Sequence, residues 1–364
     1  MRMAREPKAC LAELAASLSR PWTLMEVCGG QTHSILRWGI DQLLPSTIDL
    51  IHGPGCPVCV TPAATLDQAL RLAARPEVIL CSYGDMLRVP GSDPAADAAT
   101  LLQVRSAGAD VRLLTTPLQA LELALRHVQR QVVFLAVGFE TTAPATALLA
   151  EQARRLALSN LTLLCAHVRV VPAMEAVIAA PGHRVQGFLA AGHVAAVMGS
   201  AELEQLVVRR HLPVVITGFE PLELLQGVLA CVRLLEAGTP ALVNAYRQVV
   251  RPAGNPAAQR LLQQVFTAAD GVWRGLGTIA GGVLQLRPSY RHLDARLRFG
   301  LAYPAIAEAA GPCISAAVLQ GRRRPHECPS FGTACTPSHP LGAPMVSSEG
   351  ACAAYHAYRR SGHG

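Results

Sequence analysis

The sequence predicts an α/β protein, and two observations lead to this prediction. Short apolar runs of strand length end in Gly, Pro, Ser or Cys, and amphipathic stretches with helical period follow them. Hydrophobic residues make up 51% of the 364 residues and charged residues 16%, which excludes a disordered chain. Strands that alternate with helices form mainly parallel sheets. We therefore expect two Rossmann-like α/β domains and a third, mixed α+β domain.

The expected elements follow the chain in order. Residues 7–19 carry apolar side chains at helical spacing and predict a helix. Further helices are predicted at 222–236 and 256–268, and the chain beyond Gly271 is expected to be loop-rich because it holds several closely spaced glycines. The predicted strands are the apolar runs that precede turn residues, at 50–51, 78–80, 111–114, 132–137, 161–164, 195–198 and 214–216.

The strand rhythm fades near residue 240, and this sets the predicted domains. Residues 21–118 are expected to form the first α/β domain and residues 119–240 the second. Residues 241–364 are expected to form the third domain, onto which the N-terminal helix of residues 1–20 would pack. Since functional groups of parallel sheets gather at the carboxyl ends of the strands, we expect the site where the domains converge.

Composition excludes several classes of function. Lys8 is the only lysine and has no glycine loop nearby, which excludes a Walker-type NTPase, a kinase site and a lysine Schiff base. No apolar run approaches the ~18 residues that span a bilayer, and the charged N-terminal segment is not followed by the apolar stretch of a secretory signal. We therefore expect a cytoplasmic protein that does not bind a membrane. The net charge is +7 but aromatic residues are only 4%, so no nucleic-acid partner is expected.

Eleven cysteines carry the main reactive chemistry. Cysteines of cytoplasmic proteins are more often metal ligands or redox groups than structural disulfides. Cys28 ends an apolar run and precedes two glycines that allow a ligand close to the backbone, although the pattern also fits an ordinary strand-end cysteine above a helix start. Four others lie on a helix or beside apolar runs and are interpreted as small buried hydrophobes: Cys10, Cys81, Cys165 and Cys231.

Cys56 and Cys59 form a C-x-x-C pair after a predicted strand, at the expected start of a helix. A helix N-terminus lowers the pKa of a thiol and favours thiolate, the form that attacks disulfides and binds soft metals. The pair therefore predicts a redox dithiol or metal ligands, including half of a zinc site. A c-type haem is excluded because Val60 follows the second cysteine.

The remaining four cysteines lie in a loop-rich C-terminal stretch and predict a Cys₄ metal site. Four thiolates hold either an iron–sulfur cluster or structural zinc. Zinc sites usually show two tight C-x₂₋₄-C pairs, which this stretch lacks, so the spacing favours iron–sulfur. The four candidate ligands are Cys313, Cys328, Cys335 and Cys352.

Together these motifs resemble those of the HypD family of [NiFe]-hydrogenase maturation proteins. They run in order over nearly the whole chain. One departure is Pro344, where the family commonly has a cysteine. The matching stretches are 28–33 (CGGQTH), 52–59 (HGPGCPVC), 82–91 (SYGDMLRVPG), 138–144 (GFETTAP), 218–221 (GFEP), the four spaced C-terminal cysteines and 345–350 (MVSSEG).

The resemblance implies a scaffold on which the Fe(CN)₂CO unit of the hydrogenase is assembled. It implies a HypC-type small chaperone and a HypE-type cyanide donor as partners, with transient contact to the hydrogenase large-subunit maturation complex. Cys28 would hold the iron, and Cys56 and Cys59 would be further iron ligands or a redox dithiol. The four C-terminal cysteines would bind a [4Fe–4S] cluster, in an arrangement similar to that of ferredoxin:thioredoxin reductase.

We hypothesise that electrons run from the cluster to the dithiol and then to the iron. His33, His52, Asp85 and Glu140 fall in strand-end loops and are candidates for positioning cyanide or protons, and a structural role fits each of them equally. The main alternative is a stand-alone iron–sulfur-dependent thiol–disulfide reductase. A third hypothesis is a zinc-stabilised α/β binding module without chemistry.

Overall fold

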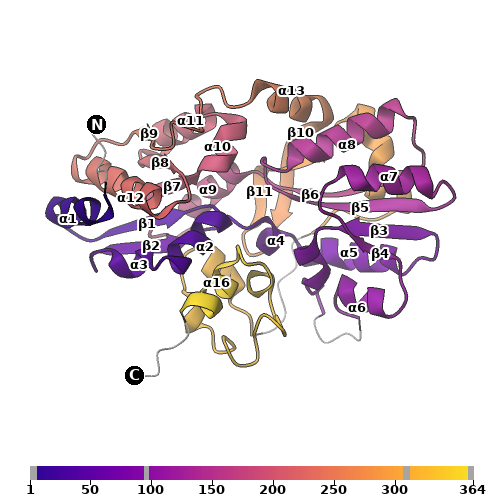
Figure 1. The fold of residues 1–364 in the computed structure, drawn as a ribbon, viewed down its shortest axis with the longest axis horizontal. Helices are drawn as coiled ribbons and strands as arrows, with labels where there is room; N and C mark the ends of the chain where they lie inside the picture. The colour runs from indigo at the N-terminus through magenta and orange to yellow at the C-terminus, as the bar shows by residue number, and fades with distance from the viewer. Residues whose placement is uncertain (1–5, 94–97, 306–311, 360–364) are drawn as a thin grey trace.

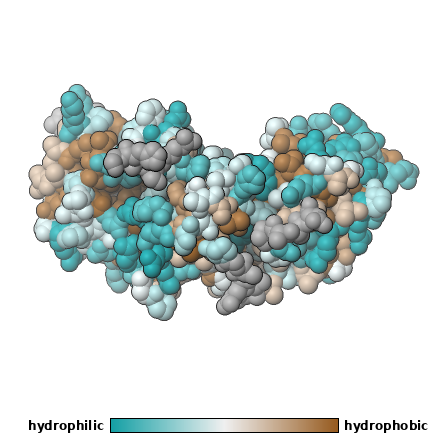
Figure 2. Space-filling view, turned by 90° about the horizontal axis from the view of Figure 1, so that it is seen from below, coloured by the Kyte–Doolittle hydropathy of each residue, from teal (hydrophilic) through white to brown (hydrophobic). Residues whose placement is uncertain are grey.

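The computed structural model describes residues 6–93, 98–305 and 312–359, and it has an α/β fold with two parallel sheets side by side (Figure 1). The predicted fold class is confirmed at this level. Among the described helices, none combines the length and the apolar character needed to cross a bilayer. Seen from below, polar side chains cover most of the surface and apolar ones lie in scattered patches (Figure 2).

The first sheet has five parallel strands in the order β2-β1-β7-β8-β9. Successive side chains of a strand point to opposite faces of the sheet, so Leu24 packs into the core on one face and Met25 into the core on the other. The strands are β1 (Trp22–Glu26), β2 (Ile48–His52), β7 (Gly187–Ala191), β8 (Val214–Thr217) and β9 (Leu242–Asn244). One face is covered by α1 (Pro7–Ser17), α2 (Gly29–Arg37), α3 (Ile40–Leu43) and α12 (Pro221–Glu236), and the other by α9 (Val170–Ala179), α10 (Gly192–Met198) and α11 (Ala201–Arg210).

The second sheet has four parallel strands in the order β4-β3-β5-β6. The residues of β3 and β5 are buried on both faces, as expected for parallel strands between helices. The strands are β3 (Val78–Ser82), β4 (Val111–Leu113), β5 (Gln131–Gly138) and β6 (Leu161–His167). The helices around it are α5 (Ala63–Ala73), η1 (Gly84–Arg88), α6 (Leu101–Ser106), α7 (Leu118–Arg126), α8 (Ala143–Arg155), α13 (Pro256–Val265) and α14 (Ala295–Phe299).

An antiparallel hairpin joins the two halves. It consists of β10 (Phe266–Trp273) and β11 (Gly277–Leu286). Trp273 belongs to the core of the first half and Phe266 to the core of the second. The backbone N–H of Arg169, between β6 and α9, donates to the carbonyl of Gly282 at 2.9 Å. The hairpin therefore holds the two sheets against each other.

The C-terminal part of the chain lies below α2 and α4 (Pro57–Val60) in Figure 1 and consists of short elements and turns, which carry the four C-terminal cysteines. The largest of these elements, α16 (Ala351–Tyr358), packs against α2. Tyr355 of α16 and Leu36 of α2 share a small apolar cluster. The other elements of the C-terminal part are α15 (Ser315–Leu319), η3 (Pro325–Glu327) and η4 (Ala343–Met345), whereas η2 (Pro288–Leu293) packs on the second sheet.

Several expected elements need correction. The run 195–198, expected as a strand, lies in α10, and the strand is the preceding Gly187–Ala191. Of the chain that was expected to be loop-rich beyond Gly271, residues 277–286 form β11 and pair with β10, which ends at Trp273. The helix expected over 256–268 ends at Val265 because β10 begins at the next residue. The other six predicted strand runs all lie within or overlap observed strands.

The sheets do not follow the predicted domain ranges. Strands β1 and β2, expected in the first domain, pair with β7, β8 and β9. Strands β3 and β4 pair instead with β5 and β6, because the chain crosses from one sheet to the other and back. The N-terminal helix α1 packs on α12 of the first sheet and not on the cluster region, since Cys10 and Leu14 share the apolar core with Leu225 and Val228.

Candidate functional site

The loops that follow β1 and β2 are bonded to each other. The Gly53 N–H donates to the Glu26 carbonyl at 2.8 Å, and the Gly29 N–H donates to the Gly55 carbonyl at 2.9 Å. A Cβ atom on Gly55 would lie 2.3 Å from the backbone nitrogen of Cys28, so only glycine fits there. Because β1 and β2 are parallel neighbours, their carboxyl ends meet, and Cys28 comes beside the C-x-x-C segment.

Glu26, at the end of β1, is the buried acceptor that organises these loops. Its carboxylate accepts the Cys28 backbone N–H at 2.8 Å and His52 Nδ1–H at 2.7 Å, and it also accepts the hydroxyl of Thr32. The carboxylate has no exposed surface. This network fixes the backbone of Cys28 at the start of α2 and orients the ring of His52. The opposite ring nitrogen, His52 Nε2, is buried and has no hydrogen-bond partner among the described residues.

The Cys28 side chain is half-buried at the N-cap of α2. Burial raises the pKa of its thiol to about 12, the N–H groups of Gln31 and Gly30 counteract this in part, and the negative charges of Glu26 and Glu349 add to it. The side chain is therefore a neutral thiol near pH 7. Coordination to a metal ion removes the thiol proton, because the positive charge of the metal stabilises the thiolate.

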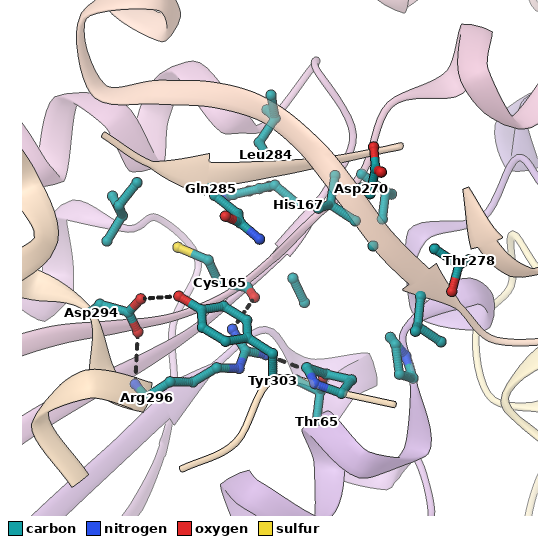
Figure 3. Close-up of a pocket in the computed structure, with 18 residues that line it drawn as sticks. Thr65, Cys165, His167, Asp270, Thr278, Leu284, Gln285, Asp294, Arg296 and Tyr303 are labelled. Atoms are coloured by element: carbon teal, nitrogen blue, oxygen red, sulfur yellow. Dashed lines mark hydrogen bonds between the residues drawn. The ribbon is translucent and has the colours of Figure 1, made fainter. Parts of the chain in front are cut away.

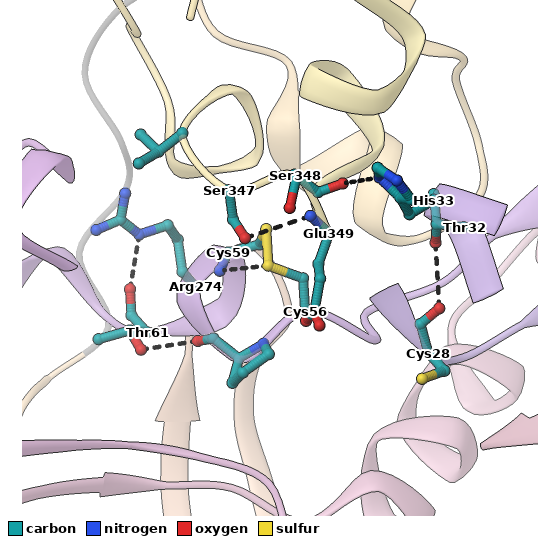
Figure 4. Close-up of a disulfide and its surroundings, with 12 residues drawn as sticks. Cys28, Thr32, His33, Cys56, Cys59, Thr61, Arg274, Ser347, Ser348 and Glu349 are labelled. Carbon is teal, nitrogen blue, oxygen red and sulfur yellow. Dashed lines mark hydrogen bonds between the residues drawn. A yellow bond between two sulfur atoms is a disulfide. The ribbon is translucent and has the colours of Figure 1, made fainter. Parts of the chain in front are cut away.

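Cys56 and Cys59 form a disulfide whose two residues are 3% and 1% exposed (Figure 4). The Cys59 N–H donates to Cys56 Sγ at 3.2 Å. The helix expected to start here is the single turn α4 (Pro57–Val60), and the longer helix α5 begins only at Ala63. The pair thus lies in an apolar core in its oxidised form.

His33 contacts the C-terminal part and connects it to this site. Its Nδ1 lies 3.1 Å from the carbonyl oxygen of Ser348, and its Nε2 lies 3.3 Å from the hydroxyl of Tyr358. The next residue, Glu349, packs so closely on Gly29 that a Cβ there would lie 2.5 Å from the Cβ of Glu349. Both ring nitrogens of His33 are engaged in contacts between α2 and the C-terminal part. Figure 4 shows the 347–349 segment over the disulfide and Cys28.

A second contact between the site and the C-terminal part comes from η1. Arg88 Nη2 donates to the carbonyl of Val346 at 2.8 Å and pairs with Asp85 at 3.1 Å. Burial raises the pKa of Glu349, the negative charge of Asp85 adds to this, and His33 counteracts it. The segment 345–350 therefore covers the site through polar contacts from both sides.

Glu140 lies apart from these contacts. Its carboxylate accepts the backbone N–H of Val170 at 3.1 Å, at the start of α9, and is 2% exposed. It lines a small, mostly apolar cavity with Glu202 and residues of α10. Burial raises its pKa to about 7. Among the described residues, no hydrogen bond or ion pair joins Glu140 to Cys28 or to the disulfide.

The four C-terminal cysteines come together around one small cavity. Burial and the mutual influence of the thiols raise the pKa of Cys352. Cys335 Sγ accepts the N–H of Leu341 at 3.3 Å, and a Cβ on Gly342 would lie 2.5 Å from Cys313 Sγ, so the chain packs tightly around the sulfurs. The cavity is lined by Cys313, Cys328, Cys335 and Cys352, with Ile314, Ser315, Val318, Phe331, Gly342, Pro344 and Met345.

This donor set is all sulfur within an apolar wall, which fits a Cys₄ metal group such as an iron–sulfur cluster or zinc. Pro344, the position where the family commonly has a cysteine, lies on the wall of the same cavity. The turn η4 that carries it also packs against α4 of the disulfide loop. The two cysteine regions are therefore neighbours.

Three of the four cysteines interpreted as buried hydrophobes are fully buried: Cys10, Cys81 and Cys231. The fourth, Cys165, is half-buried and lines a cavity of about 210 Å³ (Figure 3). Arg296 lies at one side of this cavity under the ring of Tyr303, and Asp270 lies at the other.

Sequence reasoning did not identify Glu26 or the 210 Å³ cavity. A signal for Glu26 existed, because a glutamate within the apolar run Leu24–Val27 has to be buried and bonded. The cavity is formed by segments far apart in the sequence, so a local pattern does not indicate it.

Comparison with known proteins places these features in context. The family model described as HypD, hydrogenase formation hypA family, matches residues 3–359. A hydrogenase maturation factor HypD of Rhodobacter capsulatus is 45% identical over 363 residues, covering 96% of this chain and 95% of the relative. The HypD of Escherichia coli K12 is 42% identical, covering 96% and 92%. The hydrogenase expression/formation protein HupD of Azotobacter chroococcum is 46% identical, covering 95% and 91%.

Proposed function

This chain belongs to the HypD family of hydrogenase maturation factors, and on that premise we propose that it is the scaffold on which the Fe(CN)₂CO unit of a [NiFe] hydrogenase is assembled. One observation carries the proposal. Cys28 and the Cys56–Cys59 disulfide lie on two strand-end loops that are bonded to each other. The segment that covers them belongs to the four-cysteine region.

The iron unit is the cargo of this site, and Cys28 is its ligand. Iron with cyanide and carbon monoxide ligands is a soft centre, which favours thiolate. Cys28 is half-buried, and Glu26 and Glu349 place negative charge near an incoming cation. Iron binding displaces the thiol proton, and Glu26 keeps the Cys28 backbone in place during this exchange.

The disulfide supplies the second function of the site. Opening it takes two electrons and two protons and yields two thiols, which then serve as further iron ligands or as a redox dithiol. Cys313, Cys328, Cys335 and Cys352 would hold a [4Fe–4S] cluster, whose chemistry when bound is one-electron transfer. The packing of η4 on α4 supports a functional link between the two cysteine regions.

The proposed partners are a HypC-type small chaperone that completes the iron ligands with its own cysteine and a HypE-type cyanide donor. Delivery to the hydrogenase large subunit follows assembly. The burial of the disulfide favours this scaffold over a stand-alone thiol–disulfide reductase. With exposures of 3% and 1%, Cys56 and Cys59 are closed to a protein disulfide substrate, which has to reach the sulfur directly.

Infrared spectroscopy tests the proposal. The chain is co-expressed with its HypC-type partner, purified without oxygen, and examined for the cyanide and CO stretching bands. We expect these bands in the native complex and their loss in Cys28→Ala, because the iron then lacks its ligand from this chain.

Cys10→Ala is the matched control, since this cysteine is buried under α12 away from the site, and it should keep the bands. Full band intensity in Cys28→Ala would contradict the iron assignment. A native complex without any cyanide or CO band, but with fast turnover of disulfide substrates, would establish the reductase instead.

A further inference from the structure

Arg274 lies between the two cysteine regions. It follows Trp273 at the turn of the β10–β11 hairpin. Its backbone N–H donates to the carbonyl of Val60 at 2.8 Å, and its Nε–H donates to the carbonyl of Thr61 at 2.7 Å. Both acceptors lie just after Cys59, so this side chain is tied to the disulfide loop (Figure 4).

The other side of the same turn contacts the four-cysteine region. The Gln320 side chain donates to the carbonyl of Gly275 at 2.7 Å. Gly275 has a φ of +80°, and a Cβ on it would lie 2.9 Å from the Cα of Ala316 in α15, the helix that follows Cys313. The turn therefore fits closely between the disulfide loop and the first of the four cysteines.

The guanidinium of Arg274 is only partly satisfied. Its Nη2 is buried and has no hydrogen-bond partner among the described residues. Nor does the described part of the chain place a carboxylate oxygen within 4 Å of its nitrogens. Burial lowers its pKa to about 10, and the charges of Cys313 and Asp67 counteract this. Arg274 remains a cation near pH 7.

An unpaired donor on a buried cation is costly, because the group has lost water without gaining a partner. A negatively charged neighbour would offset that cost. Four thiolates around a [4Fe–4S] cluster carry net negative charge, and its reduction adds one more negative charge. Charge and hydrogen bonds near the sulfurs are the main determinants of such a potential.

We propose that Arg274 is a positioning residue that supplies the counter-charge for the metal group held by Cys313 and its three partner cysteines, and so favours its reduced form. This inference rests on the cluster of the proposed function. Arg274 is also bonded to the disulfide loop, so the same cation lies beside both redox groups. Loss of its charge should make the cluster harder to reduce.

The test is a spectroelectrochemical titration of the anaerobically purified full chain. Arg274→Gln retains a side-chain donor for the Thr61 carbonyl but removes the charge, and Arg274→Lys retains the charge. We expect the reduction potential of Arg274→Gln to shift to more negative values, with unchanged iron and sulfide content. Arg274→Lys should stay close to the native potential.

Arg323→Met is the matched control, because Arg323 also lies in the cysteine region but is 62% exposed and screened by water. An Arg274→Gln potential equal to the native one, or shifted no more than that of Arg323→Met, would overturn the inference. If Arg274→Gln does not fold, a large negative shift in the charge-retaining Arg274→Lys overturns it equally. A native chain that binds no iron–sulfur cluster would instead contradict the proposed function, and the iron assay of the native protein detects this first.

Discussion

Cys28 and the Cys56–Cys59 pair lie at the ends of parallel strands, whereas the four C-terminal cysteines lie on turns and short helices. The first region is held by backbone hydrogen bonds between neighbouring loops and by the buried carboxylate of Glu26. The second has short helices and tight glycine packing around the sulfurs themselves. This difference indicates that the sheet builds the first region without a ligand. We predict that the second region depends on the proposed metal group for its order, as small metal-organised domains do.

The largest effect should come from removing a thiol of the C-terminal cavity. We expect Cys328→Ser to lose the metal group altogether, because three thiolates and a hydroxyl do not replace four thiolates. Hydrogen exchange should then become faster over residues 313–358 and stay unchanged in β5 and β6. Metal analysis and hydrogen-exchange mass spectrometry measure both effects.

Cys165→Ser is the control, since this half-buried cysteine lies outside the C-terminal cavity. If residues 313–358 stay protected from hydrogen exchange in metal-free Cys328→Ser, the proposed difference between the two regions is wrong, since both would then be ordered by the chain alone.

The corresponding change in the region of Cys28 is Glu26→Gln. A glutamine amide carries one acceptor oxygen and a donor NH₂, so it cannot accept from all three of Cys28, Thr32 and His52. We expect the free energy of unfolding to fall by about 4 kcal/mol, since each of these bonds is made to a buried charge. Urea denaturation measures this loss.

Metal content at the C-terminal cysteines should stay at the native level in Glu26→Gln. Glu77→Gln, in which the replaced carboxylate is 51% exposed, is the control and should change the free energy of unfolding by less than about 0.5 kcal/mol. Loss of the metal in Glu26→Gln would show that the two regions are not built independently.

A smaller effect concerns pH and the end of β5. Burial raises the pKa of Glu140 to about 7. The protonated carboxyl therefore contributes its full stability at a pH below the ordinary pKa of a glutamate. This contribution is lost as the pH rises through 7. We expect the free energy of unfolding to fall between about pH 4.5 and 7 by an amount on the order of 3 kcal/mol. Glu140→Gln should remove this part of the pH dependence, whereas the exposed Glu122→Gln should keep it. An unchanged profile in Glu140→Gln would assign the dependence to another group.

Much of the fold could be predicted because its strands are short apolar runs in front of turn residues. The runs at 78–80, 132–137 and 214–216 fall inside β3, β5 and β8. The strand predicted at 195–198 was wrong because residues 187–199 are apolar apart from the glycines and His193, so either half can serve as the strand. The first half is selected because β7 pairs with β1 on one side and with β8 on the other, and the second half forms α10.

Burial confirms three of the four cysteines interpreted as small buried hydrophobes, with Cys165 the exception. Burial does not separate these from the candidate functional cysteines, because Cys56, Cys59 and Cys335 are buried as well. The roles assigned to Cys28 and to the metal-binding cysteines remain predictions. The structure adds that the C-terminal four share one cavity, which sequence spacing alone does not establish.

Local pattern in the chain thus accounts for the α/β class, most strand positions and the candidate chemistry of the cysteines, since each depends on neighbours a few residues apart. The crossing of the chain between two sheets, the bridging hairpin and the position of Arg274 depend on contacts between residues hundreds of positions apart. Such contacts form only when the apolar faces of β1, β7 and the hairpin are buried together, and no local periodicity records which partner a strand takes. For that reason the joining of the two cysteine regions was visible only in the folded chain.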